Sequence, residues 1–329
     1  MCYIKNQHLY FKNNIKHYLC TQLKIQQTTI NINMAKKYIC GLTARNKIGC
    51  DKATFLKLVE NGVIEAKRTE TGSWQVSSKS VDQYIAKHQN SPIYKEFTNK
   101  VAIITGGANG IGKCIADEFR TNGATVYIID KQEGEHFIGD ISDKEVLEKF
   151  VAKILSKHNK VNYIINNALP LMKGIDECTY EEFQYALSVG ITAPFYLVKL
   201  LKPYLGEGAS IINISSSRDR MSQPQTESYT AAKGGIAALT HALAVSLSGR
   251  ARVNSISPGW IDTAYTVYKG SDAIQQPAGR VGNPIDIANM VLFLCSNKAS
   301  FITGENICID GGMTKQMIYH GDNGWKLNK

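Results

Sequence analysis

The sequence predicts an α/β protein, with a Rossmann-type doubly wound parallel sheet preceded by a small winged helix-turn-helix-like domain. Three observations lead to this prediction. From residue 98 onward, short β-branched runs alternate with segments of helical periodicity. A glycine-rich turn joins the first of these runs to the first helical segment. The residues in front of this region follow a shorter pattern and carry most of the positive charge.

The chain has 329 residues, which is more than one ordinary domain needs. Its first residues show no clear period, and Met34 directly precedes the first patterned segment, so we expect the leader to be disordered or not translated. The predicted divisions are a leader at 1–33, a helix-turn-helix-like domain at 34–90, a linker at 91–97 and the α/β domain at 98–329.

Composition indicates a globular protein with a sizeable core, because 43% of the residues are hydrophobic and the mean hydropathy is −0.19. No apolar run approaches the roughly 18 residues of a membrane span, and no secretory signal opens the chain. We therefore expect a cytoplasmic protein without a membrane partner. The eight cysteines form no CxxC pair, so neither a metal site nor a disulfide framework is predicted.

The net charge of +10 is concentrated at the front of the chain. Residues 1–33 contribute +4, residues 34–96 contribute +5, and residues 97–329 contribute only +1. A nucleic-acid hypothesis therefore applies to the front of the chain alone.

The segment after Met34 resembles the excisionase or MerR-like winged helix family over residues 38–88. Its predicted elements are helices at Thr43–Ile48 and Lys52–Glu60, strands at Val63–Arg68 and Ser73–Val76, and a last helix carrying Val81, Tyr84 and Ile85. The resemblance implies DNA binding, with phosphate contacts from Lys52, Lys57, Lys67 and Arg68. A basic, solvated face on a protein–protein module is the alternative.

The α/β domain begins with a buried strand, and each later strand follows a helical segment. This alternation predicts a parallel sheet with helices on both faces. The predicted strands are 101–105, 125–129, 162–166, 209–214, 252–257 and 306–309.

The glycine-rich turn TGGANGIG at 105–112 is suited to a dinucleotide phosphate. Glycine lets the backbone turn sharply and approach the phosphate, while the following helix offers unpaired N–H groups and the positive end of its dipole. A merely tight structural turn is the alternative. The predicted cofactor contacts in this turn are Thr105, Gly106, Asn109, Gly110, Ile111 and Gly112.

Two aspartates extend the predicted cofactor site. Asp130 ends the second strand 18 residues after Gly112, where a carboxylate binds the adenosine ribose hydroxyls of NAD and repels the extra phosphate of NADP. NAD is therefore the expected cofactor. Asp140 and Ile141 follow, and the Asp140 carboxylate could accept a hydrogen bond from the adenine amino group or cap the helix that starts near Asp143.

The candidate chemistry lies in Ser216 and the run YTAAK, in which Tyr229 and Lys233 share one helix face. A free tyrosine, with a pKa of about 10, is a poor base at neutral pH, but a neighbouring cation lowers that pKa. Tyr229 can then exchange a proton with an alcohol or carbonyl while hydride moves to or from nicotinamide. Ser216 would hydrogen-bond the same substrate oxygen. A surface pair without function is the alternative.

Five motifs together make residues 98–314 resemble the short-chain dehydrogenase/reductase family. They are TGGANGIG (105–112), NNA (166–168), Ser216 with YTAAK (229–233), PGWIDT (258–263) and ITGENICIDGG (302–312). The resemblance implies reversible carbonyl–alcohol hydride transfer with a nicotinamide cofactor, and a homotetramer or homodimer. It assigns acid/base catalysis to Tyr229, lowering of its pKa and ribose binding to Lys233, and substrate positioning to Ser216. Its other cofactor contacts are Asn166, Asn167, Ala168, Pro258, Gly259, Ile261 and Thr263.

Two positions depart from the family pattern. Gly190, in LSVGITAPF, stands where the family usually has an Asn that helps hold a water chain leading from the lysine to solvent. Leu169 replaces the usual glycine after NNA. We expect an NAD-dependent oxidoreductase acting on the CH–OH group of a polar alcohol or its carbonyl form. The alternative is a DNA-binding regulator that uses the same fold to sense a nicotinamide cofactor.

Overall fold

The computed structural model describes residues 38–48, 52–89, 94–264, 266, 268–319 and 321–322. The predicted leader lies outside these residues, as do the start of the predicted linker and the side chains of Lys52, Lys57 and Ile85. Contacts divide the chain into two compact units between Ser91 and Pro92. We call their described parts the N-terminal unit (38–89) and the C-terminal unit (94–322).

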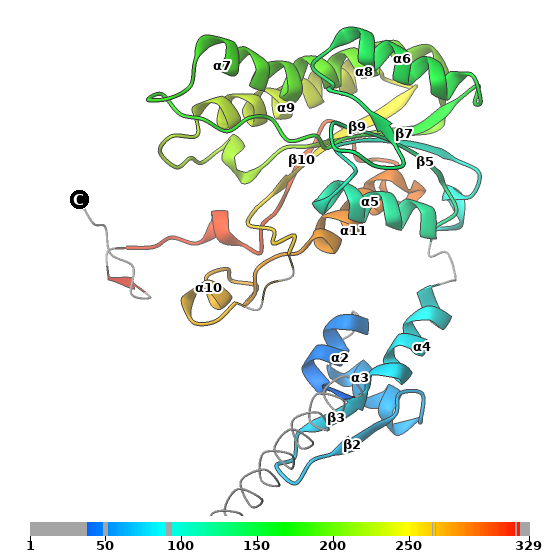
Figure 1. Ribbon diagram of the computed structural model, residues 1–329, viewed down its shortest axis with the longest axis vertical. Coiled ribbons are helices and arrows are strands. Elements are labelled where there is room, and N and C mark those ends of the chain that lie inside the picture. The colour runs from blue at the N-terminus through cyan, green and yellow to red at the C-terminus, as the bar shows by residue number, and fades with distance from the viewer. Residues whose placement is uncertain are drawn as a thin grey trace, which may run out of the picture. The chain divides into compact units, whose positions relative to one another are not determined.

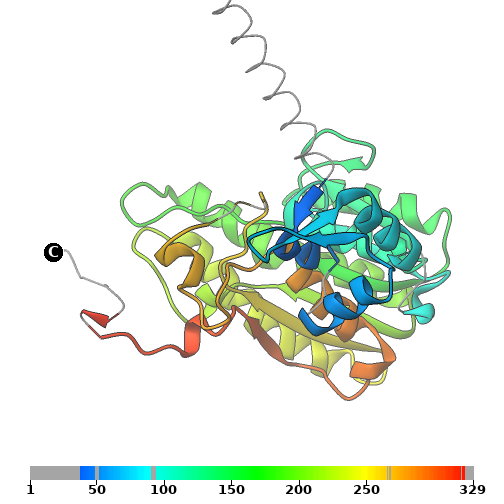
Figure 2. The ribbon, with the colours of Figure 1, turned by 90° about the horizontal axis from the view of Figure 1, so that it is seen from below.

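The N-terminal unit packs three helices against a three-stranded antiparallel sheet (blue to cyan in Figure 2). Its elements are β1 (Tyr38–Cys40), α2 (Gly41–Ile48), α3 (Lys52–Glu60), β2 (Ala66–Arg68), β3 (Trp74–Ser77) and α4 (Ser78–Gln89). The strand order is β1-β3-β2. Phe55, Ile64 and Val76 are almost fully buried, at 1%, 1% and 0% exposure. The unit therefore has a small hydrophobic core of its own.

Two features of this unit differ from the predicted elements. Strand β1 was not predicted, and the second strand begins at Ala66 rather than Val63. The backbone N–H groups of Val63 and Ile64 both donate to the Leu58 carbonyl at the end of α3, at 2.9 and 3.0 Å. These residues therefore close the helix instead of pairing in the sheet.

The C-terminal unit is built on a seven-stranded parallel sheet with the order β10-β9-β8-β7-β4-β5-β6 (Figure 1). This confirms the predicted doubly wound parallel sheet. The strands are β4 (Val101–Thr105), β5 (Thr125–Asp130), β6 (Phe137–Ile138), β7 (Val161–Asn166), β8 (Leu205–Ile214), β9 (Ala251–Pro258) and β10 (Asn306–Ile309). The two-residue strand β6 was not predicted, and β8 begins four residues before its predicted start.

Helices cover both faces of this sheet. On one face lie α6 (Lys144–Leu155), α7 (Tyr180–Leu187), α8 (Ala193–Leu201) and α9 (Glu227–Ser246), and on the other lie α5 (Gly110–Thr121) and α11 (Pro284–Cys295) (Figure 1). Each side forms its own cluster of buried side chains, centred on residues such as Phe150 and Leu197 in one and Phe119 and Val291 in the other. The sheet is thus buried on both faces, which explains its nearly continuous apolar strands.

Short helical turns complete the unit: η1 (Lys95–Phe97), the π-helical η2 (Ser188–Thr192), η3 (Lys202–Tyr204), η4 (Ser217–Asp219), α10 (Ser271–Ile274), η5 (Asn297–Ala299) and η6 (Met313–Lys315). Phe97, at the end of the predicted linker, is fully buried and packs against Phe119 and Tyr163 with ring centroids 5.3 and 5.2 Å away. The C-terminal unit therefore begins inside that linker.

The sheet changes its winding direction between β4 and β7, where the chain crosses from one side of the sheet to the other. In the register of these strands, Thr105 pairs with Asn166 at their carboxyl ends. In open α/β sheets this is the point where a crevice forms and ligands bind. The glycine turn and the NNA motif both leave the sheet here. Within the described residues, no helix is long and apolar enough to cross a membrane.

Candidate active site

The glycine turn between β4 and α5 has no room for larger side chains. Gly106 and Gly110 have φ angles of +67° and +55°, which favour glycine. A Cβ atom at Gly112 would lie 2.1 Å from the Gly106 carbonyl oxygen and 2.4 Å from the Asn167 amide nitrogen. The backbone therefore folds into a cradle that only glycine can form.

The NNA motif holds this cradle from the neighbouring strand. The Asn167 side chain donates to the carbonyl oxygens of Gly106 and Thr105, at 2.7 and 3.2 Å. The Thr105 hydroxyl in turn accepts from the backbone N–H groups of Asn167 and Ala168, at 3.0 and 3.1 Å. These bonds fix the glycine turn to the end of β7, and they give Thr105 and Asn167 a structural role beside the predicted cofactor contact.

The start of α5 fits a phosphate group. Asn109 is its N-cap residue, yet its side chain caps no backbone N–H group of the helix. Instead it donates to the Gln132 side chain. The first-turn N–H groups, at Gly110 and Ile111, therefore lack a side-chain cap and lie at the positive end of the helix dipole. Together with the glycine cradle, this arrangement suits a dinucleotide pyrophosphate.

Asp130 lies directly beside the glycine turn. One carboxylate oxygen accepts from the Ala108 N–H at 3.0 Å, and the other accepts from the Gln132 N–H at 3.0 Å. The carboxylate is thus fixed at the end of β5, next to the cradle. This is the side of the predicted site on which an adenosine ribose would lie.

The PGWIDT segment reaches the same place from the other side of the crevice. A Cβ atom at Gly110 would lie 3.2 Å from the Thr263 methyl group, so Thr263 lies over the start of α5. Pro258 pairs with Ile309 at the end of β9, and the N–H of Gly259 donates to the carbonyl of Ile309 at 3.0 Å. Ile261 forms a parallel bridge with Gly282. The structure therefore brings three of the predicted cofactor-binding segments together.

Asp140 and Ile141 are engaged within the protein. The Tyr185 hydroxyl donates to Asp140 at 2.6 Å, and the Ser142 N–H donates to its other carboxylate oxygen at 2.9 Å. Burial raises the pKa of Asp140, but these hydrogen bonds outweigh it and leave the pKa below its usual range. Asp143, not Asp140, caps α6. The Ile141 side chain is 6% exposed and belongs to the hydrophobic core.

A chain of buried polar groups runs from the cofactor crevice into α9. Asn166 donates to Asn213 at 2.8 Å, Asn213 donates to Thr240 at 2.9 Å, and Thr240 donates to the Ile236 carbonyl at 2.8 Å. The side-chain amide oxygen Oδ1 of Asn166 is buried and has no hydrogen-bond partner among the described residues. A buried acceptor without a partner loses free energy, so this oxygen suits a hydrogen bond from a bound group.

Ser216, Tyr229 and Lys233 come together where β8 ends and α9 begins. Tyr229 and Ser216 are hydrogen-bonded through their side chains. Lys233 is 3% exposed, and its ammonium group donates to the Ile214 carbonyl at 2.6 Å and lies 5.5 Å from the centre of the Tyr229 ring. A second cation, Arg218, lies 6.0 Å from the same ring centre.

The electrostatics of these groups differ from the predicted arrangement in one respect. Burial raises the pKa of Tyr229 above its usual range, while the hydrogen bond to Ser216 and the charge of Arg218 act to lower it. Burial also lowers the pKa of Lys233 to about 7. The charge of Arg218 therefore acts with the Ser216 hydrogen bond against the effect of burial on the Tyr229 pKa, while burial sets the pKa of Lys233.

Gly190 and Leu169, the two residues that depart from the family pattern, lie in very different surroundings. Gly190 is buried in the π-helical turn η2, and a Cβ atom there would lie only 2.6 Å from the Ala232 Cβ in α9. The close approach of η2 to α9 therefore excludes the usual asparagine. Leu169 is 75% exposed directly after the NNA motif, so its side chain meets no packing constraint there.

Asp219 is an anchor for the site that sequence reasoning did not identify. Its carboxylate accepts hydrogen bonds from Ser257 at 2.7 Å, from Asn306, and from Arg220 at 2.6 and 2.9 Å. These bonds tie η4, directly after Ser216, to β9 and β10. The signal in the sequence was weak, because a single aspartate in a polar loop resembles any exposed residue. Asn213 gave a clearer signal, as a polar residue within a buried apolar strand.

Comparisons with known proteins agree with this geometry. Residues 106–314 match the family model adh_short_C2, described as enoyl-(acyl carrier protein) reductase. An uncharacterized oxidoreductase of Thermotoga maritima is 41% identical, covering 67% of this chain and 98% of that protein. The L-fucose dehydrogenase of Mus musculus is 34% identical, covering 66% and 89%. The solved structure of an SCOR enzyme from Clostridium thermocellum is 46% identical, with a TM-score of 0.66, covering 70% and 99%.

Proposed function

Since the chain belongs to the short-chain dehydrogenase/reductase family, we propose that it is an NAD-dependent oxidoreductase that interconverts an alcohol and a carbonyl. The observation that carries this proposal is the convergence of Ser216, Tyr229 and Lys233 at the carboxyl end of β8, at the same edge of the parallel sheet as the glycine cradle. A bound nicotinamide would supply the acceptor, or in the reverse direction the donor, for a hydride at the substrate carbon.

The protein's own residues would move the proton and hold the substrate. In the oxidation direction the Tyr229 phenolate takes the hydroxyl proton as the hydride leaves, so the alcohol loses two electrons and becomes a carbonyl. In the reduction direction the neutral phenol, which burial favours, gives its proton to the carbonyl oxygen. Ser216 hydrogen-bonds the same oxygen and keeps it beside the phenol. Lys233, with a pKa of about 7, can bind the nicotinamide ribose and pass a proton onward near neutral pH.

The cofactor proposal rests on the cradle, the unpartnered Asn166 oxygen and Asp130. The fixed Asp130 carboxylate favours the ribose hydroxyls of NAD over the 2′-phosphate of NADP, because two negative charges in contact cost several kcal/mol. The segment Pro258, Gly259, Ile261 and Thr263 would close over the nicotinamide end. Asp140 and Ile141 would lie near the adenine.

We propose a polar, hydroxylated substrate. The residues between Ser216 and Tyr229 include Arg218, whose backbone N–H donates to the Ser216 hydroxyl, and Gln223, whose side chain accepts from Arg218. The mouse relative is named for a sugar, L-fucose, which agrees with such a substrate. The description of the matching family model names an acyl reductase instead, so an acyl substrate is the competing proposal.

The experiment that tests this function measures NADH formation or consumption with sugars, polyols, hydroxy acids, acyl thioesters and the matching carbonyl compounds. Wild-type protein is compared with Tyr229→Phe, which keeps the ring and removes the proton-transferring hydroxyl. Loss of turnover in Tyr229→Phe, by a factor of at least about 100, supports the proposal. NADH binding without turnover on any substrate of the panel contradicts it.

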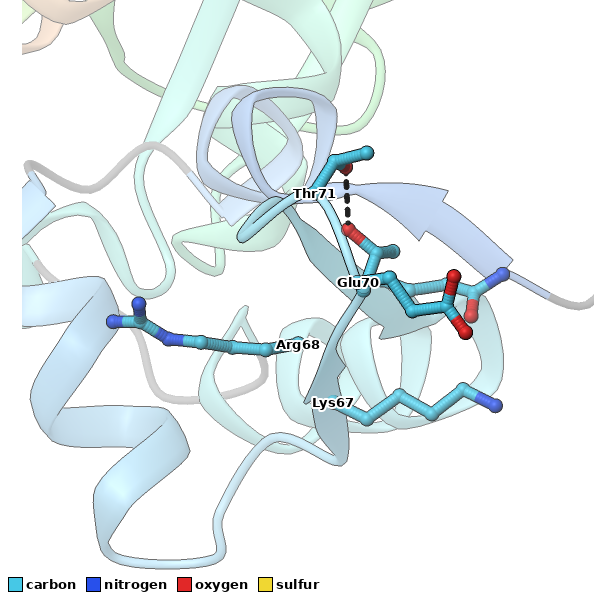
Figure 3. A pocket seen from close by; sticks show the side chains of 6 residues that line it. Lys67, Arg68, Glu70 and Thr71 are labelled. Carbon is cyan, nitrogen blue, oxygen red and sulfur yellow. Dashed lines mark hydrogen bonds between the residues drawn. The ribbon is translucent and has the colours of Figure 1, made fainter.

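A second candidate function concerns the N-terminal unit and DNA. The hairpin β2–β3 carries Lys67 and Arg68, which are both exposed and leave the strand in different directions (Figure 3). Lys67 lies 5.4 Å from the Tyr38 ring, and Arg68 lies 4.9 Å from the Trp74 ring. An open hollow of about 440 Å³ lies at this hairpin, lined by Lys67, Arg68, Thr69, Glu70, Thr71 and Gln75. We propose that this hairpin contacts DNA phosphates.

The DNA proposal predicts binding that weakens steeply with salt, because phosphate contacts release counterions. The test measures the affinity of the full-length protein for duplex DNA at several salt concentrations. The double variant Lys67→Gln/Arg68→Gln should bind more weakly and with a shallower salt dependence. Lys157→Gln/Lys160→Gln removes the same charge from the C-terminal unit and should bind like wild type. No binding at low salt would favour the alternative, a protein–protein module.

A further inference from the structure

Arg218 lies beside the catalytic tyrosine, and the proposed hydride transfer assigns its guanidinium no contact with the substrate. It lies two residues after Ser216, and its backbone N–H donates to the Ser216 hydroxyl at 3.2 Å. Its guanidinium lies 6.0 Å from the centre of the Tyr229 ring. A partly buried cation is therefore fixed beside the two side chains that would hold the reacting oxygen.

The guanidinium is poorly partnered for its chemistry. It contacts the Met172 sulfur at 3.0 Å and the Gln223 amide oxygen. A thioether is a weak acceptor, and a guanidinium has five N–H donors, so most of them are left over. Arg220 and Arg280 differ, because each makes two hydrogen bonds to an aspartate. No carboxylate within the described part of the chain pairs with Arg218.

The segment 171–173, which contains the Met172 that contacts Arg218, is hydrogen-bonded to α9, the helix that carries Tyr229. Ser228, the neighbour of Tyr229, accepts from the Lys173 N–H at 2.8 Å and donates to the Leu171 carbonyl at 3.0 Å. These bonds flank Met172 on both sides, so the backbone of the residue that touches Arg218 is tied to the helix that carries Tyr229. The contacts with Met172 and Gln223 hold the guanidinium beside Tyr229 and Ser216.

From this geometry we propose that Arg218 binds a carboxylate of the substrate, so that the enzyme acts on a hydroxy acid and its oxo-acid counterpart. A planar guanidinium can bind a carboxylate through two parallel hydrogen bonds, and partial burial strengthens the attraction by reducing solvent screening. The carboxylate is unchanged in the reaction and orients the neighbouring hydroxyl toward Tyr229 and Ser216. A phosphate is a poorer match, because Arg220, the next cation along this loop, is already neutralised by Asp219.

This inference rests on the proposed function, but binding can test it without turnover. Protein saturated with NADH cannot oxidise an alcohol, so calorimetry then reports binding alone. The probes are matched pairs of acid and neutral alcohol: D-gluconate with sorbitol, and lactate with propane-1,2-diol. We expect wild type to bind the acid of at least one pair roughly 10- to 100-fold more tightly than the neutral partner.

The variants separate Arg218 from general charge effects. Arg218→Gln should lose the preference for the acid and bind the neutral partner like wild type. Arg250→Gln, which removes an exposed arginine that donates to the Lys202 carbonyl, should keep the preference. Equal binding of acid and neutral alcohol by wild type in every pair, or an unchanged preference in Arg218→Gln, overturns the inference. Acid-selective binding without NADH formation in the turnover panel would support the Arg218 site and contradict the proposed oxidoreductase function.

Discussion

At the scale of single residues, the site is organised by charges held away from solvent. Lys233 is buried, and Asp130 has both carboxylate oxygens bound to backbone N–H groups. Among the described residues, Lys233 and the partly buried Arg218 are the two cations nearest the Tyr229 ring, at 5.5 and 6.0 Å from its centre. The role of each of these three charges can be tested with a substitution that removes the charge and keeps most of the side-chain volume.

Lys233 should make the stability of the protein depend on pH. Its pKa is lowered from 10.5 to about 7 in the folded protein. Between these values the unfolded chain binds the proton and the folded chain does not, so the free energy of unfolding rises with pH, by at most about 1.4 kcal/mol per unit. Below pH 7 both states bind the proton, and the cost of burying the charge is fully present.

Urea unfolding of wild type and Lys233→Met between pH 6 and 9 measures this effect. The unfolding free energy of wild type minus that of Lys233→Met should rise as the pH increases from 7 to 9. Near pH 6 this difference should no longer change with pH. Loss of the hydrogen bond to the Ile214 carbonyl also changes the unfolding free energy of Lys233→Met, by an amount that does not vary with pH. The exposed Lys157→Met serves as the control. A difference that stays constant from pH 7 to 9 would mean that Lys233 is charged in the folded protein.

Asp130 should determine the choice between NAD and NADP. Asp130→Asn keeps an acceptor for one backbone N–H but removes the negative charge. We expect the ratio of kcat/KM for NADP to that for NAD to rise by roughly tenfold or more, because the repulsion of the 2′-phosphate is lost. Asp117→Asn, on the exposed side of α5, should leave the ratio unchanged. An unchanged ratio in Asp130→Asn would assign the preference to other residues.

At the scale of elements, the contact between η2 and α9 sets the position of Lys233. Gly190 faces Ala232, the residue before Lys233, and both Cβ positions belong to backbone that cannot rotate away. Gly190→Ala should therefore lower the free energy of unfolding by about 1–3 kcal/mol through overpacking. It should also reduce turnover, because the backbone at Lys233 must shift.

Two further variants make this prediction specific. Ala232→Gly in the Gly190→Ala background removes the clash and should recover stability, less the roughly 1 kcal/mol cost of a glycine inside a helix. Gly234→Ala lies on the same helix with nothing within 4 Å of the added Cβ, so it should stabilise by about 0.5–1 kcal/mol. Thermal unfolding and turnover are measured for each protein. Wild-type stability in Gly190→Ala would show that the contact can relax.

Much of the C-terminal unit follows from local sequence, because strand periodicity and the glycine turn are local signals. The short elements do not. Strand β6 has only two residues, Phe137 and Ile138, which pair with Ile129 and Asp130 of β5, and two residues are too few to show a strand period in the sequence. Ile64 looks like a strand residue, yet its N–H closes α3. The motifs contained the catalytic candidates, whereas the contact of Arg218 with Met172 joins residues 46 positions apart and depends on the complete fold.

At the scale of the whole molecule, the chain consists of two units with separate hydrophobic cores. One cluster of buried residues, around Phe55 and Val76, lies wholly in the N-terminal unit, and the other two lie wholly in the C-terminal unit. All the predicted catalytic and cofactor-binding residues belong to the C-terminal unit. A domain with its own core can fold alone, so the chemistry should not require the N-terminal unit.

Deleting residues 1–91 tests this independence. We expect the full chain to unfold in two thermal transitions, one for each unit. The melting temperature of the shortened protein should lie within a few degrees of the higher of these two transitions, because its core is complete without the N-terminal unit. Its kcat/KM should stay within about twofold of the full-length value, a change of less than 0.5 kcal/mol in transition-state stabilisation. Light scattering on both proteins reports whether the N-terminal unit changes the size of the assembly. Loss of turnover by a shortened protein that still unfolds cooperatively would show that the N-terminal unit contributes to the active site. This outcome would contradict the prediction that the C-terminal unit is sufficient for the chemistry.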